Sequence, residues 1–196
     1  MGIGKQAKIL SKAQMDAVLS YLTTTRHPER DRVIFLLSVK AGLRAKEMAA
    51  LQWSMVTDAE GRLSDAINLP NSASKGRSGR VIPLNKDLKV ALERWYASCR
   101  QDRCLSGYVV TTERSPHTSS YAIVNKFAAW YRALGFSGAS SHSGRRTAIT
   151  HWARKISTVG GSLRDVQMLA GHSALSTTQR YIEGAEEARR RVVELV

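Results

Sequence analysis

The chain has 196 residues, enough for one hydrophobic core, and its hydrophobic content of 43% is typical of a globular rather than a disordered protein. No apolar run approaches the roughly 18 residues that a membrane span needs, and Met1–Leu10 lacks the apolar segment of a secretory signal. We therefore expect a cytoplasmic protein that makes no membrane contact. Thirty Lys and Arg against 16 Asp and Glu give a formal net charge of +14, which favours a polyanionic partner, nucleic acid above all.

The two cysteines do not point to a disulfide or a metal site. Cys99 and Cys104 lie five residues apart near the end of an expected helix. A reducing cytosol disfavours a disulfide between them, and a zinc site would need two more ligands that the neighbouring sequence does not offer. We expect ordinary packing or surface cysteines, and neither a metal nor a cofactor.

The first half of the chain predicts helices followed by a hairpin. Ser11 and Gln14 form a capping-box pattern, which marks the start of the first helix. A turn-rich basic segment, residues 70–79, separates two short apolar runs, as in a β-hairpin with a basic tip. The expected helices are Lys12–Leu22, Asp31–Lys40 and Arg44–Gln52, and the expected strands are Ala66–Leu69 and Arg80–Leu84.

Helical patterns resume after the hairpin and continue to the end of the chain. The expected helices are Lys86–Arg100, Ser119–Leu134, Ser143–Lys155, Leu163–Ala170, Ser176–Ile182 and Ala185–Leu195, with Tyr108–Thr111 as a further strand candidate. No repeat, low-complexity tract or long linker divides the sequence. We therefore expect one domain over residues 1–196, mainly α with a small antiparallel β-sheet.

Two basic segments in the first half carry candidate chemistry. Gly42 should end one helix and Arg44 open the next, where a guanidinium and free backbone N–H groups together suit a phosphate, with Glu47 orienting the guanidinium. The alternative is a surface ion pair between Arg44 and Glu47. On the hairpin tip, Lys75 could reach into a DNA groove or protonate a leaving oxygen. The alternative there is non-specific phosphate contact by Lys75, Arg77 and Arg80.

Two segments in the second half of the chain carry further candidate catalytic residues. His142 and Arg145 lie three residues apart, on one face of a helical turn, where they could hold a phosphate oxygen and manage a proton. A capping His and a solvated Arg are the alternative. His172 follows Gly171 at a helix end, and Tyr181 comes nine residues later. Tyr181 could be a nucleophile among cations or, next to Ile182, an ordinary core residue.

The combination of these segments resembles the tyrosine recombinase family of phage integrases and Xer-type recombinases. The likeness rests on the order Arg44, Lys75, His142-x-x-Arg145, His172, Tyr181. It extends to neighbouring positions and covers roughly Ser11–Val196. These neighbours are Glu47 after Gly-Leu-Arg, Gly76, Arg80 and Pro83-Leu84 in the hairpin, and Gly171, Ser173 and residues 176–179 around His172.

The resemblance implies a tyrosine recombinase catalytic domain that cuts and rejoins duplex DNA without metal or ATP. Tyr181 would attack a scissile phosphate and form a 3′-phosphotyrosyl bond, while Arg44 and Arg145 stabilise the transition state. Lys75 would protonate the leaving 5′-oxygen. Three more roles follow by resemblance. His142 would assist proton transfer at the nucleophile, His172 would donate a hydrogen bond to the phosphate, and Glu47 would support Arg44, with DNA contacts from Arg77, Arg80 and Arg146.

The sequence departs from the family pattern in two places. Gly144 stands where Leu is common, which should loosen the local helix by up to about 1 kcal/mol and remove an apolar anchor. The separate N-terminal domain that clamps DNA in this family has no counterpart in the ten residues before the first helix, so we expect it to be absent, either because it was removed or because the protein works without it. The amphipathic end, Glu183–Val196, should pack on a neighbouring protomer in a DNA-bound tetramer or, alternatively, on its own domain.

Two other functions are compatible with parts of this pattern. A type IB topoisomerase shares much of the implied site and would relax supercoils without exchanging strands. A DNA-binding regulator without catalysis would not need all six residues. The segment from Gly171 to Tyr181 favours the recombinase.

Overall fold

The computed structural model describes residues 7–74, 78–101, 107–113, 115–181 and 193. Within these residues the protein is mainly helical with one two-stranded antiparallel sheet, which confirms the expected fold class. No helix among them is long and apolar enough to cross a membrane. The elements are α1 (Lys12–Leu22), α2 (Pro28–Val39), α3 (Ala45–Ala50), η1 (Trp53–Met55), β1 (Ala66–Leu69), η2 (Asn71–Ala73), β2 (Arg80–Pro83), α4 (Lys86–Gln101), α5 (Ser120–Ala133), α6 (Ser141–Lys155), η3 (Ile156–Val159), α7 (Leu163–Ala170) and α8 (Leu175–Gln179).

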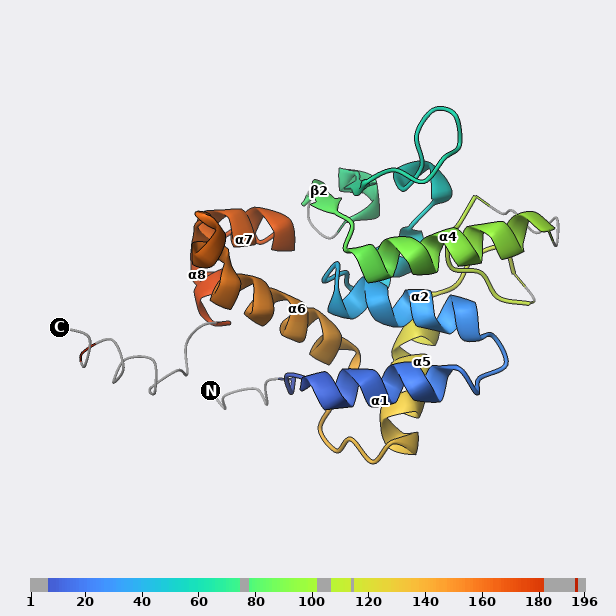
Figure 1. Ribbon diagram of the computed structural model, residues 1–196, viewed down its shortest axis with the longest axis horizontal. Coiled ribbons are helices and arrows are strands. Elements are labelled where there is room, and N and C mark those ends of the chain that lie inside the picture. Colours follow the sequence, from blue (N-terminus) through green and yellow to red (C-terminus); the bar gives the residue numbers. More distant parts are fainter. Residues whose placement is uncertain (1–6, 75–77, 102–106, 114, 182–192, 194–196) are drawn as a thin grey trace.

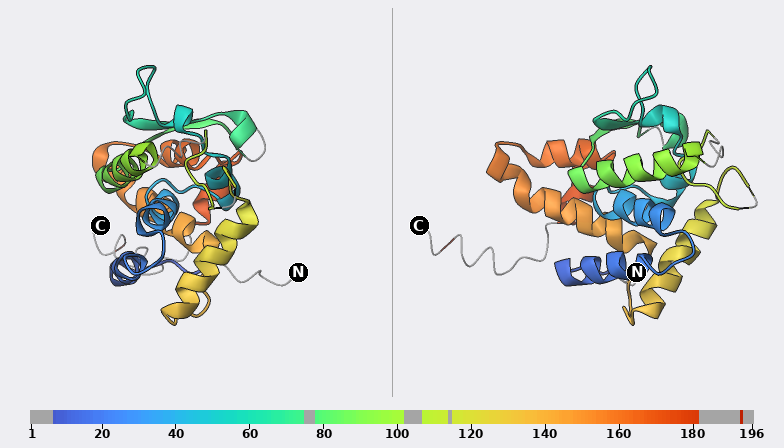
Figure 2. Two further views of the ribbon diagram at one scale, coloured as in Figure 1. Left: turned by 90° about the vertical axis from the view of Figure 1, so that its right-hand side faces the viewer. Right: turned by 45° about the vertical axis from the view of Figure 1, so that its right-hand side comes forward.

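Helix α2 is the centre of the fold. Every residue from Val33 to Val39 is buried, and a helix that is apolar on all sides belongs in the interior. It contacts α1, α3, α4 and α6. Helix α6 runs obliquely from the neighbourhood of α1 and α5 towards α7 and α8, which lie together at one end of the molecule (Figures 1 and 2).

The sheet brings the hairpin next to α7. β1 and β2 pair antiparallel, with Ala66 opposite Pro83 and Leu69 opposite Arg80. Ile67, Leu69 and Ile82 are buried, as expected for strands with one face on the core. Because β2 also contacts α7, the base of the basic hairpin lies beside the turn that carries His172.

Most differences from the expected elements occur at helix ends. α2 begins at Pro28, three residues early, because proline suits the first helical position and Glu29 favours the positive end of the helix dipole. α6 begins at Ser141, since Ser140 provides the cap. The Ser11–Gln14 capping box is present as expected.

Three further expectations differ from the structure. The helix expected from Ser176 begins at Leu175 and ends at Gln179, and the helix expected over Arg44–Gln52 is confined to Ala45–Ala50. In the expected strand Tyr108–Thr111, Tyr108 forms an isolated antiparallel bridge with Gln52, and no strand is found among these described residues. The helix expected over Ala185–Leu195 lies outside the described residues, apart from Val193.

Gly144 has a packing role that the sequence did not indicate. A Cβ atom at Gly144 would overlap the Ser38 hydroxyl and lie 2.9 Å from Ser38 Cβ and 3.0 Å from Val39 Cγ1. The expectation that Gly144 merely loosens its helix was therefore incomplete. Its missing side chain lets α6 approach the central helix α2.

Candidate active site

One pocket is lined by most of the site residues expected from the sequence. Its volume is about 290 Å³, and the expected residues in its lining are Arg44, His142, Arg145, Arg146, His172 and Tyr181. They come from the start of α3, the first turns of α6, the turn after α7 and the second residue after α8. Lys75 and Arg77 lie outside the described residues. Five of the six expected catalytic residues therefore share one cavity.

A buried carboxylate organises the α3 side of this pocket. Glu47 is fully buried, and its Oε1 accepts a hydrogen bond of 2.8 Å from Arg44 Nη1 while its Oε2 accepts one of 2.8 Å from the Arg44 backbone N–H. Arg80 donates to the same carboxylate with both terminal nitrogens, at 3.0 Å each. Glu47 thus binds two guanidinium groups and holds Arg44 at the start of α3.

The electrostatics of Glu47 follow from this arrangement. Burial alone would raise the pKa of Glu47, but the hydrogen bonds and charges of Arg80 and Arg44 outweigh it, so the pKa lies below its usual value. The carboxylate stays ionised near neutral pH. It offsets part of the positive charge that Arg44, Arg80 and Arg145 bring together.

Arg145 is held by backbone carbonyls of two distant segments. The residue is 4% exposed, and its guanidinium donates to Gly42 O and, at 2.7 Å, to Ala170 O. Burial, together with the charges of Arg44 and Arg80, lowers the pKa of Arg145 to about 10, which leaves it cationic at neutral pH. The side chain is therefore fixed before any ligand arrives, which is the preorganisation that stabilisation of an oxyanion requires.

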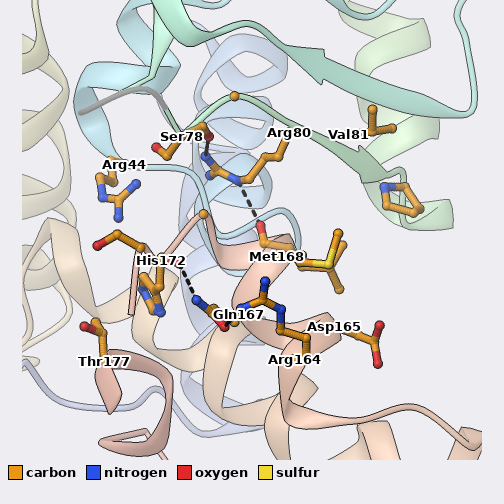
Figure 3. Close-up of a pocket in the computed structure, with 15 residues that line it drawn as sticks. Arg44, Ser78, Arg80, Val81, Arg164, Asp165, Gln167, Met168, His172 and Thr177 are labelled. Atoms are coloured by element: carbon orange, nitrogen blue, oxygen red, sulfur yellow. Dashed lines mark hydrogen bonds between the residues drawn. The ribbon is translucent and has the colours of Figure 1, made fainter. Parts of the chain in front are cut away.

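Two arginines together stabilise the carboxyl end of α7. Arg80 Nε donates to Leu169 O at 2.8 Å, next to the bond from Arg145 to Ala170 O. Cations at this end of a helix interact favourably with its unpaired carbonyls and its dipole. Gly171 then ends the helix with a φ of 62°, and a Cβ there would lie 2.8 Å from Arg80 Nη1. Figure 3 shows Arg80 between β2 and this turn, with Arg44 and His172 to one side.

His172 is fixed at both ring nitrogens. Its Nε2 lies 3.1 Å from Arg145 Nη2, and its Nδ1 lies 2.9 Å from the hydroxyl of Thr178. Gln167 also donates to the His172 backbone carbonyl at 2.9 Å (Figure 3). Burial, and then the charges of Arg145, Arg44 and Arg80, lower the pKa of His172 to about 4. The ring is therefore neutral near pH 7 in the protein alone.

Tyr181 borders both the pocket and a small apolar cluster. Its ring stacks on His172, with centroids 5.5 Å apart and planes 23° apart, and Arg146 lies over the ring at 5.8 Å. It also packs against the cluster of Ile149, Val166 and Ala170. The interpretations of Tyr181 as a nucleophile and as a core residue are thus compatible, because part of the ring is packed while the residue also lines the pocket.

His142 and Arg146 lie on the accessible side of the pocket. His142 is exposed at the start of α6, where its backbone N–H donates to the Ser140 side chain. Arg146 is partly exposed on the next turn of the same helix. Both side chains can therefore meet a ligand that approaches the pocket from solvent.

Three residues of the site have roles that the sequence did not indicate. Arg80 was expected on the hairpin surface, but its side chain is 5% exposed and directed at Glu47 and α7. Gln167 and Thr178 are buried polar residues beside His172; the sequence assigned no role to Gln167 and included Thr178 only in the segment that resembles the family. Gln167 could have been found from its position on the buried face of the expected helix Leu163–Ala170. Thr178 could have been found from the Thr-Thr pair before Tyr181.

A larger groove opens on the other side of Arg80. It has a volume of about 1060 Å³ and runs between β2 and α7, from Arg44 and His172 to the exposed side chain of Met168 (Figure 3). Among the described residues, no group of three or more His, Cys, Asp or Glu side chains is arranged to hold a metal ion. The polar side chains along this groove are those of Arg44, Arg80, Arg164, Asp165, Gln167, His172 and several hydroxyl residues.

Comparison with known proteins identifies relatives of this chain by sequence. Residues 8–188 match the model of the phage integrase family. The chain is 29% identical over 182 residues to tyrosine recombinase XerC of Shewanella sp. (strain ANA-3), covering 90% of this chain and 57% of the relative. It is 30% identical over 197 residues to tyrosine recombinase XerA of Thermococcus kodakarensis, covering 95% and 62%. The chain therefore spans about three fifths of the length of these relatives.

Solved structures with the same fold include several recombinases. A crystal structure of XerA recombinase superposes with a TM-score of 0.76 at 20% identity, over 95% of this chain and 64% of that one. A lambda integrase dimer bound to a COC′ core site gives a TM-score of 0.69 at 17% identity, over 95% and 51%. At these identities the likeness concerns the fold. With the match to the family model over most of its length, this chain belongs to the phage integrase family of tyrosine recombinases.

Proposed function

We propose that this chain is the catalytic domain of a site-specific DNA recombinase that cleaves and rejoins duplex DNA through a 3′-phosphotyrosyl intermediate at Tyr181. The observation that carries this proposal is the shared pocket, in which Tyr181 lies with Arg44, Arg145, His142 and His172. A tyrosine among fixed cations suits attack on a phosphodiester. The cations stabilise the charge that develops on the phosphate during attack by the tyrosine.

The arginines act first on the scissile phosphate. Arg44 and Arg145 bind the non-bridging oxygens. Because Glu47 already holds Arg44, and the carbonyls of Gly42 and Ala170 hold Arg145, little reorganisation is needed. Loss of one such donor typically slows a reaction about 10²–10³-fold. His142, on the accessible side, assists proton removal from Tyr181, and His172 donates a hydrogen bond to the phosphate. Lys75 protonates the leaving 5′-oxygen.

The rejoining step uses the same groups in reverse. A 5′-hydroxyl from another strand attacks the phosphotyrosine, the bond to Tyr181 breaks, and the phenolic oxygen recovers its proton. One phosphoester bond forms for each that breaks, so the balance needs neither ATP nor a metal.

DNA is the partner that the surface favours, with Arg146 and Arg77 as phosphate contacts. The net charge of +14 supports this assignment, and the Tn1549 transposon integrase with transposon right end DNA and the XerH recombinase bound to difH substrate share the fold. We further propose a tetramer on DNA joined through residues 183–196, acting in the cytoplasm. Arg80 we assign to the support of Glu47 rather than to DNA contact, because its side chain is buried.

Covalent capture of DNA tests the function without a known target site. A randomised pool of nicked duplexes is incubated with the full chain, and protein–DNA adducts that survive denaturation are isolated, amplified and captured again. The nick lets the short cleaved fragment diffuse away, so that the phosphotyrosyl adduct accumulates. We expect enrichment of a sequence family with the wild-type chain and none with Tyr181→Phe, which keeps the ring and removes the nucleophile.

The same selected duplex distinguishes the alternatives. Supercoil relaxation without joined recombinant products would assign a topoisomerase instead. Tight, sequence-specific binding with no adduct under any tested condition would assign a non-catalytic regulator and end the enzyme proposal.

A further inference from the structure

Thr178 is a buried polar residue beside His172 that the proposed chemistry does not yet use. It is 0% exposed on α8, and its Oγ1 lies 2.9 Å from His172 Nδ1. Its backbone carbonyl accepts a hydrogen bond of 3.0 Å from the Tyr181 N–H. The residue therefore links the imidazole of His172 to the turn that carries the proposed nucleophile.

The contact on the other side of the ring decides the tautomer of His172. Nε2 lies 3.1 Å from Arg145 Nη2, and a guanidinium has hydrogen-bond donors only. Nε2 must therefore carry a lone pair in the protein alone. A neutral imidazole has its one proton on the other nitrogen, so Nδ1–H donates to the Thr178 hydroxyl, which acts as the acceptor.

A bound phosphate reverses these requirements. A non-bridging phosphate oxygen has no proton to give, so the ring nitrogen that meets it must be protonated. If Nε2 gains a proton and the ring stays neutral, Nδ1 loses its proton and needs a donor. Solvent can exchange these two protons, since the ring is only half-buried. A hydroxyl can change from acceptor to donor by rotating about one bond, so Thr178 can serve both states.

We propose that Thr178 is a positioning residue for His172: its buried hydroxyl accepts from Nδ1 in the free protein and supports Nε2–H towards the phosphate in the bound state. This proposal rests on the proposed function, because it concerns the phosphate of that reaction. It also explains why a polar side chain occupies a fully buried position on a helix of five residues. The stacking of His172 on Tyr181 then transmits the fixed ring orientation to the nucleophile.

Three variants separate the hydroxyl from the rest of the side chain. Thr178→Val keeps the shape and removes the hydrogen bond, whereas Thr178→Ser keeps the hydroxyl and removes the methyl group. Thr150→Val is the matched control. Thr150 is also 0% exposed, lies on α6, and its hydroxyl has no hydrogen-bond partner among the described residues.

The first measurement needs no DNA. Nitrogen-15 NMR of the imidazole, assigned with His172→Asn, should show the Nδ1–H tautomer in the wild-type protein and in Thr178→Ser. Titration with inorganic phosphate should move the His172 proton to Nε2 or protonate both nitrogens. An Nε2–H tautomer in the free wild-type protein would overturn the proposal.

The second measurement is the rate of adduct formation on the captured duplex. We expect Thr178→Val to be about tenfold slower, the equivalent of about one hydrogen bond, with Thr178→Ser within about twofold of wild type. The dissociation constant for DNA should not change in either variant, and Thr150→Val should match wild type in both quantities. Equal rates for Thr178→Val and wild type, or equally slow Val and Ser variants, would show that the hydroxyl has no such role.

The two measurements distinguish a failure of the proposed function from a failure of the proposal for Thr178. If the wild-type chain forms no adduct at all, the proposed function fails, and the tautomer measurement still decides how Thr178 holds His172. If Thr178→Val does not fold, the folded Ser variant and the wild-type NMR spectrum decide the question. A normal rate with the Nδ1–H tautomer in Thr178→Ser supports the proposal, and a rate reduced about tenfold there contradicts it.

Discussion

Glu47 shows at the scale of single residues how one buried charge is tolerated. A carboxylate removed from water is costly unless it is paired and fully hydrogen-bonded. Here the hydrogen bonds from two arginines and from a backbone N–H meet both carboxylate oxygens. The result is a rigid support for Arg44 whose stability depends on the ionised state of Glu47.

Glu47→Gln should therefore destabilise the protein in a pH-dependent way. Removing one partner of a buried ion pair typically costs about 3–5 kcal/mol, because the partner charges remain. The folded pKa of Glu47 is lowered, so its contribution is present above the ordinary value of 4.5 and is lost as pH falls through the folded pKa. Urea unfolding should thus show a large difference between wild type and variant at pH 7 that shrinks below pH 4.5.

Comparing wild type with Glu47→Gln removes the contributions that other carboxylates make to the pH dependence of unfolding. Asp58, Glu113 and Asp165 also have lowered pKa values, but they titrate in both proteins and cancel in the difference. Glu60→Gln, at an exposed carboxylate paired with Arg62, should have almost no effect at either pH. A pH-independent difference for Glu47→Gln would contradict this account of the buried pair.

At the scale of elements, the end of α7 depends on two requirements at Gly171. Its φ of 62° favours glycine, and the space a side chain would need is occupied by Arg80. Gly160 has a φ of 76° but no atom within 4 Å of an added Cβ. The two glycines therefore share the backbone conformation and differ only in the neighbouring arginine.

Gly171→Ala should consequently be more harmful than Gly160→Ala. Both variants bear the left-handed backbone cost of roughly 1–2 kcal/mol, and only Gly171→Ala also displaces Arg80 from Leu169 O and Glu47. Thermal unfolding should rank them in that order, and adduct formation should fall in Gly171→Ala alone. Equal losses in the two variants would mean that the approach of Arg80 is unimportant.

The contact between α2 and α6 gives a second prediction at this scale. Gly144→Ala should destabilise the protein by about 1–3 kcal/mol, the usual cost of overpacking, in spite of the better helix propensity of alanine. Adding Ser38→Ala should recover part of this loss, because it removes the overlapping hydroxyl but leaves Ser38 Cβ at 2.9 Å.

Gly107→Ala is the matched control for this contact. No atom lies within 4 Å of an added Cβ at Gly107, so its unfolding midpoint should stay near that of wild type. A Gly144→Ala protein as stable as the Gly107→Ala protein would show that α6 can move away from α2 without cost.

At the scale of the whole molecule, the excess positive charge should govern the strength of DNA binding. Each phosphate neutralised by a cation releases counterions, so the logarithm of the binding constant falls with the logarithm of salt by about 0.9 per contact. Arg146→Ala, at the accessible side of the pocket, should therefore weaken binding and reduce the slope by about 0.9. Fluorescence anisotropy with a short duplex over a range of salt concentrations measures both quantities.

Arg62→Ala removes the same charge at a different place. Arg62 is 74% exposed and already paired with Asp58 and Glu60, so it contributes little to the field at the pocket. The DNA-binding constant of Arg62→Ala should therefore depend on salt concentration with the same slope as that of wild type. An equal loss of slope in the Arg62 and Arg146 variants would indicate a general effect of net charge rather than a phosphate contact at Arg146.

The sequence by itself determined the helical class, the approximate elements and the residues that meet in the pocket. These features are encoded locally, by apolar periodicity, capping residues and short motifs whose order along the chain is distinctive. The expected helix ends were less accurate, since α2 begins at Pro28, three residues before the expected Asp31. The structure does not describe Lys75 and Arg77, whose roles stay predictions.

Only the tertiary structure decided which polar side chains support the site. Arg80 appears in the sequence as one more basic residue of a hairpin, yet it meets Glu47 and Leu169, which are 33 and 89 residues away. The role of Gly144 likewise follows only from its contact with Ser38 on α2, and that of Thr178 only from its contact with the ring of His172. Such contacts depend on how distant segments pack, and neither propensity nor periodicity carries that information.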